Sequence, residues 1–269
     1  MPHINVGPLD LYYEIRGSGP RLFFISGTGS DLRRHPNIFD SPLADQFEIL
    51  AYDQRGLGQS ARPDVDYTMI DYANDADALL QHLDWDPCVV LGISFGGMVA
   101  QEFALRFPHR ISRLVLACTS AGGAGGHSYP LQNLSHLSPR EWASMILMLS
   151  DTRRDAEWRK LNAQLFDQLV EQVLESQSIG ANEPGREMGA RRQIEARKGH
   201  DTYARLPAVE LPVFVCGGKF DGIAPTENLD ALAKQITGAK LELFDGGHMF
   251  YLQDCRAFDR IADFYNGAV

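Results

Sequence analysis

The chain has 269 residues, 44% of them hydrophobic and 22% charged, which is ordinary for a globular protein with one core and a sizeable insertion. Its formal net charge is −10, so repulsion disfavours nucleic acid and anionic membranes as partners, and a small-molecule substrate is expected. A few arginines lining a pocket could reverse this charge locally, which keeps a small anionic substrate compatible with the composition. The sequence does not indicate an oligomeric state.

Targeting and cysteine patterns predict a cytoplasmic location. Residues 1–10 lack a basic segment followed by an apolar one, and no run of about 18 apolar residues predicts a membrane span. The four cysteines have no Cys-x-x-Cys spacing, so we expect reduced, buried side chains rather than metal ligands. They are Cys88, Cys118, Cys216 and Cys255. Neither a metal nor an organic cofactor is expected.

Short apolar runs, each bounded by turn residues, predict the strands of a sheet. Residues 9–15 alternate between apolar and polar, which is typical of an antiparallel strand. Continuous apolar runs are typical of strands covered on both faces, and they occur at residues 22–25, 49–52, 88–91, 114–118, 213–216 and 241–244.

Amphipathic patterns between these runs predict helices. Residues 69–83 follow a candidate cap at Asp66 or Thr68, and residues 95–107 are ended by Pro108. Further helices are predicted at residues 228–236 and 258–264. Strands that alternate with helices predict an α/β fold with a mostly parallel sheet and helices on both faces.

The alternation stops between residues 121 and 206. Helices are predicted there at residues 138–149, 157–178 and 186–205, the first with Ser138 as cap and a proline at its first position. We therefore predict that residues 1–120 and 207–269 form the core, and that residues 121–206 form a helical cap inserted into it.

The most informative segment is Gly-Ile-Ser-Phe-Gly-Gly at residues 92–97, between a predicted strand and a predicted helix. This is the context of a G-x-S-x-G nucleophile turn, in which glycines permit strained backbone angles and close packing of strand and helix. The alternative is a simple turn of small residues. The flanking strand and helix favour Ser94 as a nucleophile at the positive end of a helix.

On these residues the chain resembles the serine branch of the α/β-hydrolase superfamily, over nearly its whole length outside the insertion. The resemblance implies a triad in the chain order Ser94, Asp221, His248. His248 follows the last predicted strand in Asp-Gly-Gly-His-Met, and Asp221 follows the strand before it in a segment similar to the family's G-x-x-D-x-x-x-P. Asp245 is a less favoured acid, because it lies only three residues before His248.

The resemblance also implies an oxyanion hole made by the backbone N–H groups of Phe95 and Thr28. Ser26 stands where the family commonly has histidine, which weakens the assignment of Thr28, and the alternative is a plain glycine turn. Residues 53–60 resemble the family segment D-x-R-G-x-G-x-S, which we interpret as structural.

Candidate substrate-binding residues are Gly27 and Met249 beside the predicted triad, and Trp142 and Met145 in the cap. Ordinary packing between cap helices is the alternative for the last two. Four arginines are interpreted as a solvated helix face, with the alternative that one pairs with a substrate carboxylate. They are Arg186, Arg191, Arg192 and Arg197. Three histidines of the insertion could line a pocket: His127, His136 and His200.

Residues 92–120 are most similar to enol-lactone hydrolases and small carboxylesterases. We therefore predict a metal-independent serine hydrolase that cleaves a small carboxylic ester or (enol-)lactone through an acyl-enzyme. Hydrolases of carbon–carbon bonds in dienoic ring-fission products share the triad and are the alternative. A ligand receptor that retains the triad is a third hypothesis, from a different class. Dehalogenases and epoxide hydrolases of this fold use an aspartate nucleophile, so Ser94 disfavours both.

Overall fold

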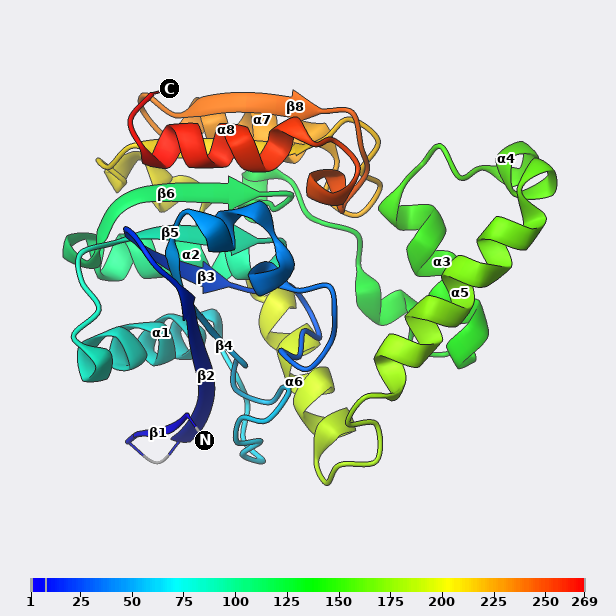
Figure 1. Cartoon of the computed structure of the whole chain (residues 1–269), viewed down its shortest axis with the longest axis horizontal. Helices are drawn as coiled ribbons and strands as arrows, with labels where there is room; N and C mark the ends of the chain where they lie inside the picture. The colour runs from blue at the N-terminus through cyan, green and yellow to red at the C-terminus, as the bar shows by residue number, and fades with distance from the viewer. Residues whose placement is uncertain (1, 8, 269) are drawn as a thin grey trace.

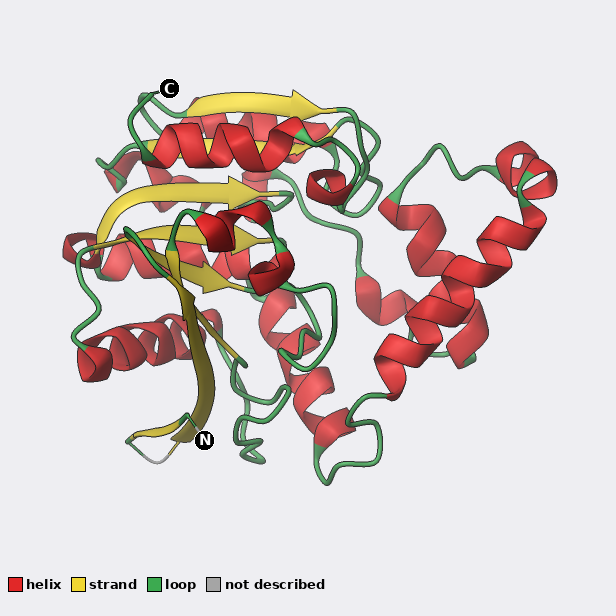
Figure 2. Cartoon of the chain, viewed as in Figure 1, coloured by secondary structure: helices red, strands yellow, loops and turns green. Residues whose placement is uncertain are grey.

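A computed structural model describes residues 2–7 and 9–268, and it contains an eight-stranded sheet (Figures 1 and 2). The strands are β1 (His3–Val6), β2 (Leu9–Gly17), β3 (Arg21–Ile25), β4 (Glu48–Tyr52), β5 (Cys88–Ile93), β6 (Ile111–Ala117), β7 (Val213–Gly218) and β8 (Lys240–Phe244). Their order is β1-β2-β4-β3-β5-β6-β7-β8. Only the β1–β2 and β2–β4 pairs are antiparallel among these strands, so the prediction of a mostly parallel α/β sheet is confirmed.

The burial of each strand follows its sequence pattern. All six residues of β5 are buried, as expected for a continuous apolar run, whereas burial alternates at the start of β2. Strand β1 was not predicted, since it is only four residues long and has a single buried side chain.

Helices cover both faces of the sheet, as predicted. Helices α1 (Met69–Leu83), α2 (Phe95–Arg106) and α7 (Thr226–Gln235) share one hydrophobic core on one face, and α8 (Arg256–Tyr265) contributes to a second core on the other face. Thr68 caps α1 through a reciprocal pair of hydrogen bonds with Asp71, which decides between the two predicted caps. Short 3-10 turns also occur outside the insertion: η1 (Ile38–Asp40), η2 (Pro42–Asp45), η3 (Pro108–Arg110) and η7 (Phe250–Leu252).

The segment between β6 and β7 is helical, and α3–α5 stand apart from the sheet in Figure 1 while α6 runs back toward it. Its elements are η4 (Gly123–Gly125), η5 (Leu131–Leu134), α3 (Pro139–Ser150), α4 (Ala156–Leu161), α5 (Ala163–Ser178), α6 (Arg186–Lys198) and η6 (Tyr203–Ala208). Helices α3 and α5 pack through a small core of Ala143, Leu147 and Val170. The exact limits of a cap domain stay a prediction.

Two predicted helices of this segment were wrong in extent. The helix expected at 157–178 is interrupted at Asn162, whose side-chain Nδ2 donates to the carbonyl of Trp158 and ends α4. The helix expected at 186–205 ends at Lys198, because Gly199 forms its C-cap.

The cysteine prediction holds for three of four residues. Cys88, Cys118 and Cys216 are free and buried, whereas Cys255 is free but exposed, since it precedes α8 in a surface turn. None of the helices in the described part of the chain is both long and apolar enough to cross a membrane.

Candidate active site

The parallel strands bring three predicted site residues to one edge of the sheet. Ser94 directly follows β5, Asp221 follows β7 and His248 follows β8, all at the carboxyl ends. The Nε2 of His248 lies 3.0 Å from the Oγ of Ser94, and its Nδ1 lies 2.7 Å from Oδ2 of Asp221. This is the geometry in which an imidazole can accept a serine proton while a carboxylate orients the ring.

The turn at Ser94 is strained and tightly packed. Ser94 has φ 55° and ψ −117°, a conformation that L-residues rarely adopt. Its N–H donates to the carbonyl of Ala117 at 2.9 Å, and its own carbonyl accepts from Thr119 Oγ1 at 2.7 Å. A Cβ at Gly96 would lie 2.0 Å from the carbonyl oxygen of Ile25, so only glycine allows α2 to approach β3 this closely. These contacts hold the serine hydroxyl at the sheet edge.

Asp221 is held by the loop that follows β7. Its Oδ1 accepts backbone N–H bonds from Ile223 at 2.8 Å and Ala224 at 2.9 Å, and its side chain is fully buried. These bonds leave Oδ2 directed at His248. The less favoured acid, Asp245, has a carboxylate that is 63% exposed and lies 3.9 Å from Arg153 Nη1, so it does not orient the imidazole.

The end of helix α3 supports both loops that carry Asp221 and His248. The carbonyl of Ser150 accepts from the N–H of His248 at 2.5 Å, and the carbonyl of Leu149 accepts from the N–H of Gly222 at 2.9 Å. Sequence reasoning missed this support because backbone contacts between distant segments leave no residue-type signal. The inserted helices therefore help to position the imidazole.

The loop after β3 lies beside Ser94. A Cβ at Gly27 would be 3.5 Å from the Cβ of Ser94, which places this predicted substrate-binding residue next to the hydroxyl. Phe95 is the first residue of α2, so its N–H has no intrahelical acceptor and points out of the positive helix end. Thr28 Oγ1 is buried and has no hydrogen-bond partner among the described residues. The roles of the Phe95 and Thr28 amides as oxyanion donors stay a prediction.

The other predicted substrate-binding residues lie in varied surroundings. Trp142 packs against the small core between α3 and α5, as the alternative of ordinary cap packing anticipated. Met145 lines an open depression with Ser138 and Ser144, which contains no residue of the triad. Met249 is 41% exposed next to His248. Substrate contact by these residues remains a prediction.

The segment 53–60 joins neighbouring loops, in agreement with its interpretation as structural. The carboxylate of Asp53 accepts from the N–H groups of Leu32 and Gln59, each at 2.8 Å, and so connects two loops. Burial raises the pKa of Asp53 to about 7. Arg55 forms a paired hydrogen bond with Asp75 at 2.6 Å.

The expectation that four arginines form a solvated face was wrong for Arg197 and for Arg186, whose side chain is only 18% exposed and lies 3.6 Å from Asp31 Oδ2. Arg191 is exposed, and Arg192 pairs with Asp64 at 3.2 Å. Arg197, however, is only 8% exposed, and the preceding Ala196 belongs to the main hydrophobic core. His200 is also buried, at 4% exposure. Among residues 2–7 and 9–268, no group of three or more His, Cys, Asp or Glu side chains is placed to hold a metal ion.

Comparison with known proteins identifies the family. The family model described as alpha/beta hydrolase fold matches residues 20–254. The chain belongs to this family. A poly(3-hydroxyalkanoate) depolymerase of Ectopseudomonas oleovorans is 29% identical over 88% of this chain and 80% of its own length. A 3-oxoadipate enol-lactonase of Acinetobacter baylyi is 25% identical over 91% of this chain and 87% of its own.

A solved structure has the same fold. The meta-cleavage product hydrolase of Pseudomonas fluorescens IP01 superimposes with a TM-score of 0.79 at 21% identity, covering 97% of this chain and 96% of that one. The similarity to enol-lactone hydrolases inferred from residues 92–120 agrees with these relatives, which are hydrolases. Their chemistries differ, so family membership alone supports a hydrolase without choosing its substrate.

Proposed function

We propose that this member of the α/β-hydrolase family is a serine hydrolase that cleaves a small carboxylic ester or (enol-)lactone through an acyl-enzyme. The observation that carries the proposal is the continuous hydrogen-bonded chain from Ser94 Oγ through His248 to Asp221, with distances of 3.0 and 2.7 Å. A serine hydroxyl is a weak nucleophile by itself, and this arrangement supplies the base that it needs.

The acylation step follows from the tautomer that the partners favour. His248 Nδ1–H donates to Asp221, so Nε2 carries a lone pair and takes the Ser94 proton as Oγ attacks the acyl carbon. The oxyanion accepts hydrogen bonds from the N–H groups of Phe95 and Thr28. When the tetrahedral intermediate collapses, the bond to the leaving oxygen breaks and His248 donates the proton to that oxygen.

Deacylation repeats these transfers with water. His248 Nε2 takes a proton from a water molecule, whose oxygen attacks the acyl carbon, and the Ser94 oxygen leaves with the returned proton. In a lactone, the leaving oxygen belongs to the same molecule as the acyl group. One open-chain hydroxy acid (or, from an enol-lactone, one keto acid) is then the product.

Two of the relatives favour ester or lactone chemistry over the alternatives. The names of the depolymerase and the enol-lactonase both describe hydrolysis at an ester carbonyl. The meta-cleavage hydrolase, at 21% identity, supports only the common fold. Carbon–carbon bond hydrolysis is therefore kept as an alternative outcome of the assay.

The test compares the native chain with Ser94→Ala on p-nitrophenyl acetate, an enol-lactone and a dienoic ring-fission analogue. We expect turnover of the ester or the lactone and a loss of at least about 10³-fold in kcat in the variant. Turnover of the dienoate alone would support the carbon–carbon bond hydrolase. Equal rates for both proteins, with tight binding of a ligand, would contradict the proposal and favour a receptor.

A further inference from the structure

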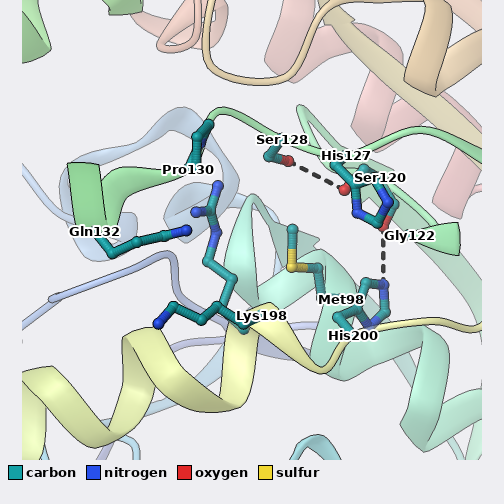
Figure 3. Close-up of a pocket in the computed structure, with 10 residues that line it drawn as sticks. Met98, Ser120, Gly122, His127, Ser128, Pro130, Gln132, Lys198 and His200 are labelled. Atoms are coloured by element: carbon teal, nitrogen blue, oxygen red, sulfur yellow. Dashed lines mark hydrogen bonds between the residues drawn. The ribbon is translucent and has the colours of Figure 1, made fainter.

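A polar cavity lies between helix α2, the end of β6 and the inserted segment (Figure 3). It has a volume of about 180 Å³ and is lined by ten residues, of which Met98 comes from α2 and Ser120 from the end of β6. Arg197 and His200 contribute from the end of α6 and the turn after it. The cavity is smaller than a typical drug-sized site, so it suits a group of a few heavy atoms.

Arg197 is the unusual side chain of this cavity. Its Nη1 donates to the carbonyl of Tyr129 at 2.9 Å, but its Nε and Nη2 have no hydrogen-bond partner among the described residues. Desolvation lowers the pKa of Arg197 to about 10, which leaves the guanidinium charged at neutral pH. A buried charge without a counter-ion is costly, so this position favours a bound anion.

The chain itself supplies no anion to Arg197. No acidic side chain of the described residues lines the cavity or forms an ion pair with this guanidinium. The neighbouring Lys198 is already paired with Glu195 at 2.9 Å. The protein as a whole carries a net charge of −10, so this unpaired guanidinium gives the cavity a local charge of the opposite sign.

Other lining groups suit a carboxylate. The hydroxyls of Ser120 and Ser128 lie 3.1 Å apart, and Figure 3 shows them on the same side of the cavity. Hydroxyls can donate to an anion, and Gln132 adds an amide. His200 Nε2 lies 3.0 Å from the carbonyl of Ser120, while burial lowers its pKa to about 4. The imidazole is therefore neutral at pH 7, and Arg197 is the main positive charge.

The cavity is close to the nucleophile. Met98 follows Ser94 by four residues in α2, which is one helical turn, or about 6 Å along the axis. Ser120 follows Thr119, whose hydroxyl donates to the carbonyl of Ser94 at 2.7 Å. Two lining residues of the cavity therefore lie within one helical turn of Ser94 or next to a residue that contacts its backbone.

We propose that this cavity, with Arg197 as its anchor, binds a carboxylate carried by the substrate a few bonds from the ester or lactone carbonyl that Ser94 attacks. The inference rests on the proposed function and narrows the substrate class to ester or lactone acids. A guanidinium with two free N–H groups can bind a carboxylate through paired, charge-assisted hydrogen bonds.

The first experiment compares half-esters with their neutral diesters. Monomethyl and dimethyl succinate, glutarate and adipate are assayed by methanol release with the native chain, Arg197→Gln, Arg197→Lys and the control Arg191→Gln. Arg191 is exposed on the same helix. We expect the ratio of kcat/KM for the half-ester to that for the diester to fall roughly tenfold or more in Arg197→Gln. Arg197→Lys should keep part of this preference and Arg191→Gln all of it.

The second experiment measures binding without catalysis. Glutarate should raise the Tm of the native chain and of Arg191→Gln relative to chloride at equal ionic strength, and this rise should disappear in Arg197→Gln. A rise in Tm without any half-ester preference would overturn the substrate assignment in favour of a free carboxylate ligand. If the native chain shows neither a rise in Tm nor a half-ester preference, the assignment of the cavity as an anion site is overturned.

The two proposals can fail separately. If the native chain cleaves no ester but glutarate raises its Tm through Arg197, the anion site stands and the proposed hydrolysis fails. If neutral esters are cleaved at Ser94 and no carboxylate is preferred or bound, the hydrolase stands and the anion site is wrong.

Discussion

The side-chain Oε1 of Gln193 in α6 accepts a hydrogen bond of 2.8 Å from the backbone N–H of Gly29. Gln193 is fully buried, and Gly29 follows Thr28 in the loop beside Ser94. The last long helix of the insertion therefore fixes the loop that carries one proposed oxyanion donor. This contact joins segments that are 164 residues apart in the sequence.

Replacement of Gln193 by Met should reduce kcat while leaving the triad intact. The substitution keeps the side-chain volume but leaves the Gly29 N–H without its acceptor, a loss of about 1–3 kcal/mol in a buried setting. We expect kcat for p-nitrophenyl acetate to fall by about tenfold through displacement of Thr28. Gln193→Glu keeps an acceptor oxygen and should retain more activity. Equal activity of Gln193→Met and the native chain would show that the loop holds its position without this bond.

Replacement of Asp221 by Asn should abolish activity without unfolding the protein. The Asn oxygen can still accept from the N–H groups of Ile223 and Ala224, so the side-chain NH2 group would face His248 Nδ1. That nitrogen must then accept, which places the ring proton on Nε2 and removes the base. We expect kcat to fall by about 10⁴-fold with little change in Tm. Asp245→Asn is the matched control, and comparable losses in both variants would argue against Asp221 as the orienting acid.

Replacement of Gly247 by Ala should disturb the loop that carries His248. The added Cβ would lie 1.9 Å from the carbonyl oxygen of Ser150, so α3 or the loop must move. We expect a loss of about 1–3 kcal/mol in the free energy of unfolding, together with reduced kcat. The control is Gly199→Ala, whose Cβ would be 3.6 Å from its nearest neighbour. Normal activity and stability of Gly247→Ala would contradict the packing described for this loop.

His200 should make the protein less stable in mild acid. Burial lowers the pKa of His200 from 6.5 to about 4, so the unfolded chain binds a proton at a higher pH than the folded one. This contribution to stability is complete above pH 6.5 and is lost as the pH falls toward 4, by at most about 3 kcal/mol. Denaturant titrations from pH 7 to 4.5 should show a smaller decline for His200→Gln than for the native chain. An exposed control, His82→Gln, should decline as the native chain does.

The sheet and the three converging side chains were predictable because their signals are local. Ser94, Asp221 and His248 each follow an apolar run at a turn, and parallel strands bring such turns to one edge. The interruption between helices α4 and α5 at Asn162 was not predictable from hydrophobic periodicity, since the apolar pattern continues across this residue. The burial of Arg197 was not predictable either, because it depends on how α6 packs against segments far away in the sequence.

The carbonyls of Leu149 and Ser150 accept hydrogen bonds from the loops of Asp221 and His248, and these bonds limit how this chain could be recombined with its relatives. A chimera that exchanged the whole insertion would also exchange the two carbonyls that brace those loops. Grafts that begin after residue 152 would retain these two hydrogen bonds and would be the better starting point for altering substrate selectivity by design.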